Sequence, residues 1–203
     1  MVLKWDRKFK ILGFAMVRII AGTAKGRKLE TPEGLDTRPT LDRVKEAAFG
    51  SLQFLIPYSS VLDLFSGSGN LGLEAASRGA DLVVLNDKNP KCSELIKRNA
   101  VRCGLQDKVR VLNLDYLAAI ELLKAEGLSF DIVLLDAPYK DGTAQIACEE
   151  LFRNHMIREN GTVLIEFATE LDPPHGIPGL MRIRKTKHYG ACSFSLLEGD
   201  SEL

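Results

Sequence analysis

The chain has few of the residues that usually mark metal or thiol chemistry. Among its 203 residues there are only four cysteines and three histidines. The cysteines lie far apart in sequence without a C-x-x-C pair, and no histidine cluster is present to complete a zinc site. We therefore expect buried thiols in a reducing compartment, no bound metal, and no nucleophile of the Ser-His or Cys-His type.

Long hydrophobic runs are also missing. No apolar run approaches the roughly twenty residues that a membrane-spanning helix needs, and residues 11–16 are too few for a signal-peptide core. With 45% hydrophobic and 27% charged residues, the composition is that of a globular protein with one substantial core. We expect a cytoplasmic protein without membrane contact, and a monomer.

Charge is balanced overall but unevenly distributed. The net charge is zero, yet residues 1–28 carry eight Lys or Arg and a single acid, Asp6. A local basic segment on a neutral protein favours a polyanionic partner. For residues 1–15 a solvated tail rich in lysine is the alternative. Met16 begins a stretch that reads like a second protein start, so we expect residues 1–15 to be an extension outside the fold.

From residue 60 onward, apolar runs alternate with segments of helical period. Strands are expected at 60–65, 81–86, 109–113, 130–135 and 161–167, and helices at 70–78, 90–103, 117–126 and 143–154. This alternation indicates an α/β protein with a parallel sheet covered on both faces. After residue 174, two β-like segments flank Tyr189 and Gly190, as in an antiparallel hairpin.

The segment before this sheet reads differently. Residues 17–40 mix short β-like runs with glycine and proline, which suits a hairpin-like arm beside the core. A helix is expected to begin near Thr40 or Asp42 and to end near Phe54. We therefore divide the chain into an extension at 1–15, a basic arm and helix at 16–57, and one α/β domain at 58–203.

A glycine turn after the first expected strand points to a nucleotide-like ligand. Residues 67–72 spell G-x-G-x-x-G, and Asp87 follows after about twenty residues, as in a dinucleotide-binding fingerprint. That pattern alone is weak. Asp63 inside the preceding strand and the tetrapeptide at 136–139 argue against a nicotinamide enzyme, because binding of a nicotinamide dinucleotide requires neither feature.

On these residues the chain resembles the class I methyltransferases that use S-adenosylmethionine, whose mostly parallel seven-stranded sheet ends in an antiparallel hairpin. The resemblance implies that the glycine turn receives the methionine part, Asp87 the ribose hydroxyls, and Asp115 the adenine amino group. The residues expected to bind the cofactor are Asp63, Phe65, Gly67, Ser68, Gly69, Asn70, Asp87, Lys88, Asp115 and Tyr116.

The tetrapeptide Asp136, Ala137, Pro138 and Tyr139 follows the fourth expected strand. It resembles the (Asp, Asn or Ser)-Pro-Pro-(Tyr or Phe) motif of enzymes that methylate exocyclic amino groups of nucleobases. Such an amine has its lone pair delocalised into the ring, so it needs acceptors for its N–H bonds; the Asp136 carboxylate and the Ala137 carbonyl provide two. Tyr139 offers a ring for the base to stack on. Alanine at 137 departs from the motif but keeps the carbonyl.

The amino-terminal residues narrow the resemblance. Residues 18–29, 37–40 and 43–47 look like the signature of the RsmD family of bacterial ribosomal RNA methyltransferases, and the likeness extends over nearly all of residues 16–197. It implies methylation of a guanine N2 in small-subunit RNA, with the free RNA, the subunit or an assembly intermediate as partner. The residues expected to contact RNA phosphates are Arg18, Lys25, Arg27, Lys28, Arg38, Arg43 and Lys45.

Two alternatives stay open at this point. The tetrapeptide by itself also suits an adenine-N6 amino-methyltransferase acting on DNA or RNA. The departure at Ala137 is compatible with a catalytically silent RNA-binding or assembly factor that has kept the fold. Arg43 and Lys45 have a simpler interpretation as the exposed face of a helix.

Overall fold

The computed structural model describes residues 17–31, 39–138 and 142–200. Its strands are β1 Ser60–Asp63, β2 Leu82–Asn86, β3 Val109–Leu112, β4 Phe130–Leu135, β5 Ile157–Ala168, β6 Met181–Tyr189 and β7 Cys192–Gly199. Its helices are α1 Pro39–Leu52, α2 Asn70–Ser77, α3 Pro90–Cys103, α4 Tyr116–Ala125 and α5 Thr143–Arg153, with the short 3-10 helix η1 Gln106–Lys108. The expected extension at residues 1–15 lies outside the described residues.

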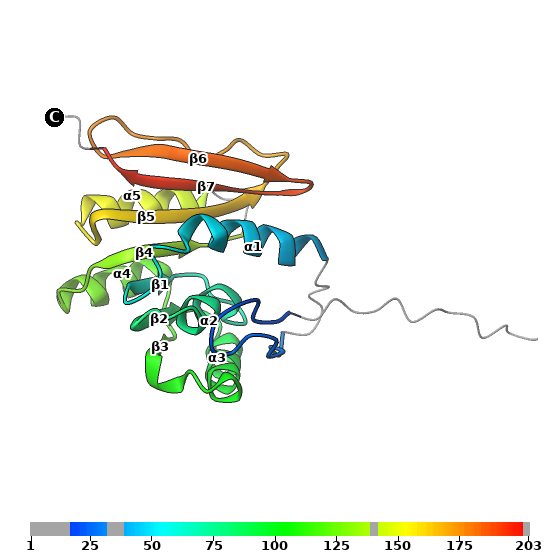
Figure 1. Ribbon diagram of the computed structural model, residues 1–203. Helices are drawn as coiled ribbons and strands as arrows, with labels where there is room; N and C mark the ends of the chain where they lie inside the picture. Colours follow the sequence, from blue (N-terminus) through cyan, green and yellow to red (C-terminus); the bar gives the residue numbers. More distant parts are fainter. Residues whose placement is uncertain (1–16, 32–38, 139–141, 201–203) are drawn as a thin grey trace, which may run out of the picture.

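The strands form one seven-stranded sheet in the order β3-β2-β1-β4-β5-β7-β6 (Figure 1). The strands β1 to β5 pair in parallel, and β7 is antiparallel to both β5 and β6. The expected fold class, a mostly parallel sheet with a carboxyl-terminal hairpin, is confirmed. Because the chain order reverses between β1 and β4, the loops after these strands diverge and leave room for a ligand at their carboxyl ends.

Successive residues of the central strands belong to two different cores, which explains why these strands are apolar throughout. Val61 and Leu134 pack with α1, α2 and α3, whereas Leu62 and Leu135 pack with α4 and α5. Both faces of the sheet are therefore covered by helices. No helix in the described part of the chain is long and apolar enough to cross a membrane.

The strand β5 begins four residues earlier than the apolar pattern predicts. Ile157 pairs with Phe130, and the register then shifts before Thr162 pairs with Ile132. The extra residues bulge out, and Asn160 among them has a positive φ of 62°. Residues 158–160 are exposed and polar, so hydrophobicity alone did not identify this part of the strand.

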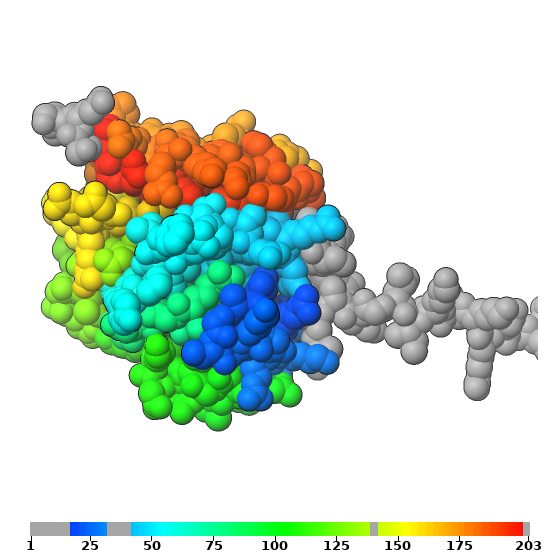
Figure 2. Space-filling model, in the orientation of Figure 1, coloured from blue at the N-terminus to red at the C-terminus, as the bar shows by residue number. Residues whose placement is uncertain are grey.

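Residues 17–31 form the expected hairpin-like arm, with an antiparallel bridge between Arg18 and Lys28. Ile19 and Leu29 are buried in the same core as α2 and α3, which places the arm against these helices (Figures 1 and 2). The arm and the sheet thus share one core. The boundary between the arm with α1 and the remaining domain at residue 57 remains a prediction.

A buried acid is one of the groups that attach the arm to the core. Glu74 on α2 is fully buried, and its oxygens accept hydrogen bonds from the backbone N–H groups of Ile20 at 2.7 Å and Ala21 at 2.9 Å. The same carboxylate pairs with Lys45 at 3.0 Å and Arg78 at 2.8 Å. Two cations and two backbone donors therefore compensate this buried charge.

Candidate functional site

The glycine turn connects β1 to α2 at the carboxyl edge of the sheet. The Ser66 hydroxyl donates to the Asp63 carbonyl at 2.7 Å, which bends the chain sharply out of the strand. Gly67 then has a φ of +56°, in the left-handed region that favours glycine. A Cβ at Gly67 would meet no described atom within 4 Å, so this side of the turn is open. An open, side-chain-free backbone is what a ligand needs in order to approach closely.

Asp63 lies under this turn and is only 1% exposed. Its Oδ2 accepts a hydrogen bond from the Gly72 N–H at 2.8 Å, whereas its buried Oδ1 has no hydrogen-bond partner among the described residues. Burial raises the pKa of Asp63 to about 7. Glycine at position 72 makes room for this contact, because a Cβ there would lie 3.0 Å from Asp63 Oδ2 and 2.6 Å from Leu85 Cδ2. Asp63 is therefore a buried acid of which only one carboxyl oxygen has a described side-chain hydrogen bond.

Asp87, directly after β2, stands beside the glycine turn as expected. Its Oδ2 accepts from the Gly67 N–H at 2.9 Å, and its Oδ1 accepts from the Asn89 N–H at 2.8 Å. The preceding Asn86 was not predicted from the sequence. Its buried side-chain amide donates to the carbonyls of Leu64 and Leu114 and accepts from the Leu114 N–H. Asn86 thereby holds the three strand-end loops together; the available signal was a polar residue ending a buried apolar strand.

The third expected acid has a local role in the structure. Asp115 caps α4, with its Oδ1 accepting from the Leu117 N–H at 3.1 Å. The ring of Tyr116 lies 5.5 Å from that of Phe65, so the loops after β1 and β3 meet through these aromatic residues. Lys88 is exposed beside Asp87. These residues surround the same strand ends as Asp63, which is the grouping that the sequence predicts.

Asp136 and Ala137 follow β4 at the same edge. Ala137 is buried, whereas Asp136 and Pro138 are accessible to solvent; Tyr139 lies outside the described residues. Although part of Asp136 reaches solvent, the surrounding protein desolvates its carboxyl group, and this desolvation, reinforced by the nearby carboxylates of Glu166 and Asp63, raises the pKa of Asp136 well above its ordinary value. A carboxyl group in this setting binds protons more readily than an ordinary aspartate.

The register of the sheet brings three acids to one face. Asp63 pairs with Leu134 on β4, and Leu134 pairs with Leu164 on β5. Side chains alternate along a strand, so Asp136 and Glu166, each two residues further on, project toward the same face as Asp63. Glu166 is 8% exposed and was not predicted from the sequence. In sequence it is one acid within an apolar strand, and only the pairing reveals its neighbours.

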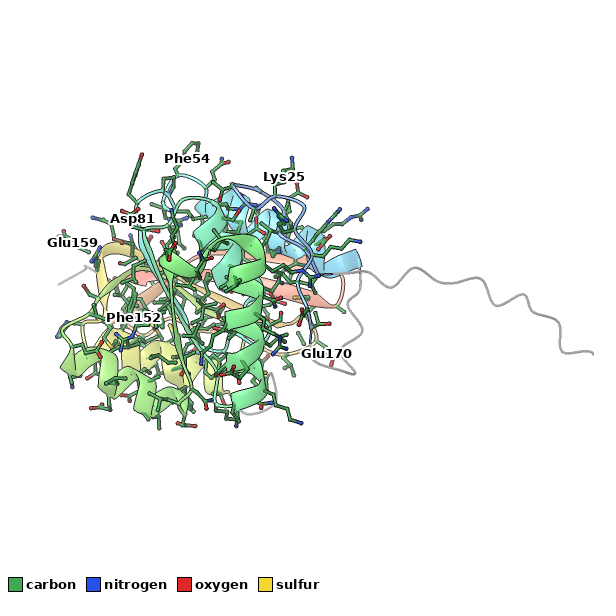
Figure 3. All side chains as sticks on the ribbon, turned by 90° about the horizontal axis from the view of Figure 1, so that it is seen from below. Lys25, Phe54, Asp81, Phe152, Glu159 and Glu170 are labelled. Atoms are coloured by element: carbon green, nitrogen blue, oxygen red, sulfur yellow. The ribbon has the colours of Figure 1, made fainter. Side chains whose placement is uncertain are left out.

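The predicted RNA contacts divide into exposed and buried residues. Arg18, Lys25, Arg27, Lys28 and Arg43 are exposed, and Arg38 lies outside the described residues. Figure 3 shows Lys25 at the outer surface of the molecule. Lys45, in contrast, is 3% exposed; besides Glu74, its Nζ donates to the Arg18 carbonyl at 2.6 Å and to Asn70 Oδ1 at 2.7 Å. The expectation that Lys45 contacts RNA is therefore corrected: Lys45 is a buried structural residue that connects the arm to α2.

A second buried residue, Asn99 on α3, also joins the arm to the glycine turn. Its side-chain amide donates to the carbonyls of Glu30 and Ser68, both at 2.9 Å, and its Oδ1 accepts from the Glu30 N–H at 2.9 Å. Asn99 is fully buried and was missed because an asparagine within an amphipathic helix gives no local signal. The arm and the glycine turn thus share two internal supports, Lys45 and Asn99.

The four cysteines take no part in this edge as free nucleophiles. All four are buried, and burial raises the pKa values of Cys92, Cys103 and Cys148, the last to about 12. Such thiols are protonated and inert at neutral pH. The fourth, Cys192, donates from its Sγ to Glu166 Oε1 at 3.0 Å.

Comparison with known proteins places these observations in a family. The model of the family described as "Conserved hypothetical protein 95" matches residues 17–198. The chain belongs to this family. The resemblance to RsmD is thereby confirmed, and the ribosomal RNA small subunit methyltransferase D of Haemophilus influenzae is 35% identical over 90% of this chain and 93% of that protein.

Solved structures agree on the architecture. A hypothetical protein of Thermus thermophilus, TTHA0928, is 31% identical, with a TM-score of 0.76 over 89% of this chain and 98% of that one. The structure of SMU.776, complexed with SAH, is 15% identical, with a TM-score of 0.65 over 84% of this chain and 52% of that one. At that identity the likeness concerns the fold alone.

Proposed function

We propose that the protein transfers a methyl group from S-adenosylmethionine to the exocyclic N2 of a guanine in small-subunit ribosomal RNA. The observation that carries this proposal is the placement of Asp136 and Ala137 beside the glycine turn and Asp63. The RNA substrate follows from the family relationship, because the Haemophilus influenzae relative is named a ribosomal RNA small subunit methyltransferase. We further propose a cytoplasmic, monomeric protein.

The residues at the sheet edge fit the cofactor. Asp63 has a buried oxygen without a described partner, which suits the ammonium group of the methionine part or a water bound to it. Gly67 leaves the turn open, and the two oxygens of Asp87 suit a pair of ribose hydroxyls. When bound, S-adenosylmethionine supplies an electrophilic methyl group on a positively charged sulfur.

The chain's own contribution to the reaction is to hold the amine and to manage its proton. Asp136 and the Ala137 carbonyl accept the two N–H bonds and thereby orient the nitrogen lone pair toward the methyl donor. Once methylated, the nitrogen must lose a proton, and the raised pKa makes Asp136 a competent acceptor. The four buried cysteines offer no covalent route, so we propose direct transfer.

The arm binds the parts of the RNA that lie away from the reacting base. Lys25, Arg27 and Lys28 are exposed on a segment that is fixed to the core by Glu74, so their charges are presented in a defined place. Contacts of this kind hold phosphates without reading sequence. Base selection then falls to the sheet edge.

The test is methyl transfer with identification of the product. Small ribosomal subunits, and separately their naked RNA, are prepared from cells that lack the endogenous enzyme and are incubated with protein and labelled S-adenosylmethionine. We expect N2-methylguanosine after digestion to nucleosides. Formation of N6-methyladenosine would show that the protein methylates adenine and not guanine. Binding of cofactor and RNA without any methylated product would indicate a catalytically silent assembly factor.

A further inference from the structure

Glu166 has a position that the proposed mechanism does not yet use. It lies on β5, the strand next to β4, on the same face as Asp136 and one pair beyond the contact between Leu135 and Ile165. Neighbouring strands lie about 4.8 Å apart, so side chains on one face at the same level of the sheet are close neighbours. The carboxylate of Glu166 also contributes to the raised pKa of Asp136, which agrees with this proximity. Glu166 therefore stands beside the group that is proposed to hold the reactive amine.

The Glu166 side chain is held in a defined orientation. It is 8% exposed, and its Oε1 accepts a hydrogen bond from the thiol of Cys192 on β7 at 3.0 Å. Cys192 in turn pairs across the sheet with Ala168, two residues beyond Glu166. A nearly buried carboxylate whose orientation is fixed by a hydrogen bond from a neighbouring strand is a rigid acceptor, suited to recognition.

The hydrogen-bonding edge of guanine differs from that of the other amino-bearing bases. Guanine presents two adjacent donors, the N1–H and the 2-amino group. Adenine places an acceptor, N1, beside its amino group, and cytosine likewise places N3. An ionised carboxylate can only accept hydrogen bonds. An ionised Glu166 consequently complements the N1–H of guanine and opposes the lone pair that adenine or cytosine would bring to that position.

We infer that Glu166 is the residue that selects guanine, by accepting the N1–H while Asp136 and the Ala137 carbonyl hold the 2-amino group. This inference rests on the proposed function and assigns the base specificity of the same site. Guanine relieves the repulsion between the two carboxylates by bridging them with donors. An adenine in the same place leaves Glu166 facing a lone pair.

The inference is tested with an analogue that lacks the N1–H of guanine. The same analogue also lacks O6, so the Glu166 variants are compared with wild-type protein on both RNAs to isolate the N1–H contact. 2-Aminopurine keeps the 2-amino group of guanine but has an unprotonated N1, so it lacks the donor that Glu166 reads. Once the methylated position is known, RNA is assembled by ligation with guanine or 2-aminopurine there, and kcat/KM is measured for both. The RNA is supplied in whichever form, free or reconstituted, the wild-type protein methylates. Wild-type protein is expected to prefer guanine about 10- to 100-fold, the range for one hydrogen bond to a charged group.

Glu166→Gln is the decisive variant, because the new carbonyl can still accept from Cys192 while the new amide N–H can donate to the N1 of 2-aminopurine. We expect the preference for guanine to fall at least about tenfold, by slower transfer to guanine and unchanged or faster transfer to 2-aminopurine. Glu166→Asp keeps the charge but withdraws the oxygens, so the preference is expected to fall here as well. Glu170→Gln removes a charge from an exposed position shortly after β5 (Figure 3), and it should leave the preference unchanged.

Each other outcome overturns the inference. An unchanged preference in Glu166→Gln, or an equal loss of activity on both RNAs in the two Glu166 variants, would make Glu166 a structural residue. A wild-type protein that methylates guanine but does not discriminate against 2-aminopurine would contradict the inference while leaving the proposed function intact. If the wild-type protein methylates adenine only, the proposed function fails first, and the product analysis reports this independently.

Discussion

Two buried carboxylates lie close together in the sequence but have opposite surroundings. Glu74 on α2 is surrounded by two backbone donors, Lys45 and Arg78, and it fixes the arm. Asp63 at the end of β1 has one donor, Gly72, and a buried oxygen with no partner among the described residues. A fully compensated acid is typical of structure, and an undercompensated one is typical of a ligand site. The comparison distinguishes the scaffold of this protein from its reactive edge.

The largest expected effect is at the reactive edge. Asp136→Ala removes both an acceptor for the amine and the proton acceptor, so we expect kcat to fall about a thousandfold. Affinity for S-adenosylhomocysteine, measured by calorimetry, should stay within about twofold, because Asp136 is assigned to the base. An unchanged kcat would remove this carboxylate from the mechanism.

Removing the scaffold acid should affect stability instead. Glu74→Ala leaves the Lys45 ammonium buried without its counterion and releases two backbone donors, so the free energy of unfolding should fall by about 3 to 5 kcal/mol. Denaturant unfolding measures this. Glu94→Ala is the control, since Glu94 pairs with Lys97 at an exposed site and its loss should leave the unfolding midpoint unchanged. Equal effects of the two substitutions would contradict the assignment of Glu74 as the anchor.

Asp63 should make the stability of the ligand-free protein depend on pH. Its pKa is raised from 3.8 to about 7, so the folded state holds a proton that the unfolded state releases. Its stabilising contribution is complete below about pH 4 and is lost as the pH rises through 7, with a total of about 2 to 4 kcal/mol. Asp63→Asn keeps an acceptor for Gly72 and should lack this loss. Identical pH profiles of unfolding for the two proteins would show that Asp63 is not the titrating group.

The smallest of these mutational effects concerns the arm. Arg27→Glu should weaken RNA binding by about tenfold at moderate salt and reduce the slope of log affinity against log salt by about one. Affinity for S-adenosylhomocysteine should not change. Arg153→Glu reverses an exposed charge on α5, on the other side of the sheet, and serves as the control. If both variants bind RNA equally well, the arm is not the RNA surface.

The features that sequence predicted are those with local signals. The apolar runs and helical periods located the strands and helices to within a few residues. Acids ending three successive strands pointed to Asp63, Asp87 and Asp115, and the tetrapeptide pointed to Asp136. Sequence failed where a role depends on pairing between distant segments. Glu166 acquires its neighbour through the register of β4 and β5, and Asn99 through the docking of the arm.

For Lys45, the sequence pattern predicted a functional surface residue where the structure has a buried structural one. Arg43 and Lys45, two positions apart on α1, suggested an exposed basic face. The arm covers the Lys45 side of α1, however, and places the Lys45 ammonium beside Glu74. The early start of β5 at Ile157 was also hidden, because its first residues bulge and face solvent. Both cases depend on tertiary packing that overrides the local pattern.

The most direct test of this account is calorimetric titration of S-adenosylhomocysteine into the wild-type protein and Asp63→Asn at pH 6 and pH 8. The account predicts that the ligand's ammonium group favours ionised Asp63. Affinity of the wild-type protein should then rise about tenfold between these pH values, given a pKa of about 7 for Asp63 in the ligand-free protein. The rise should be largely lost in Asp63→Asn. An equal pH dependence in both proteins would contradict the claim that the undercompensated acid marks the cofactor site.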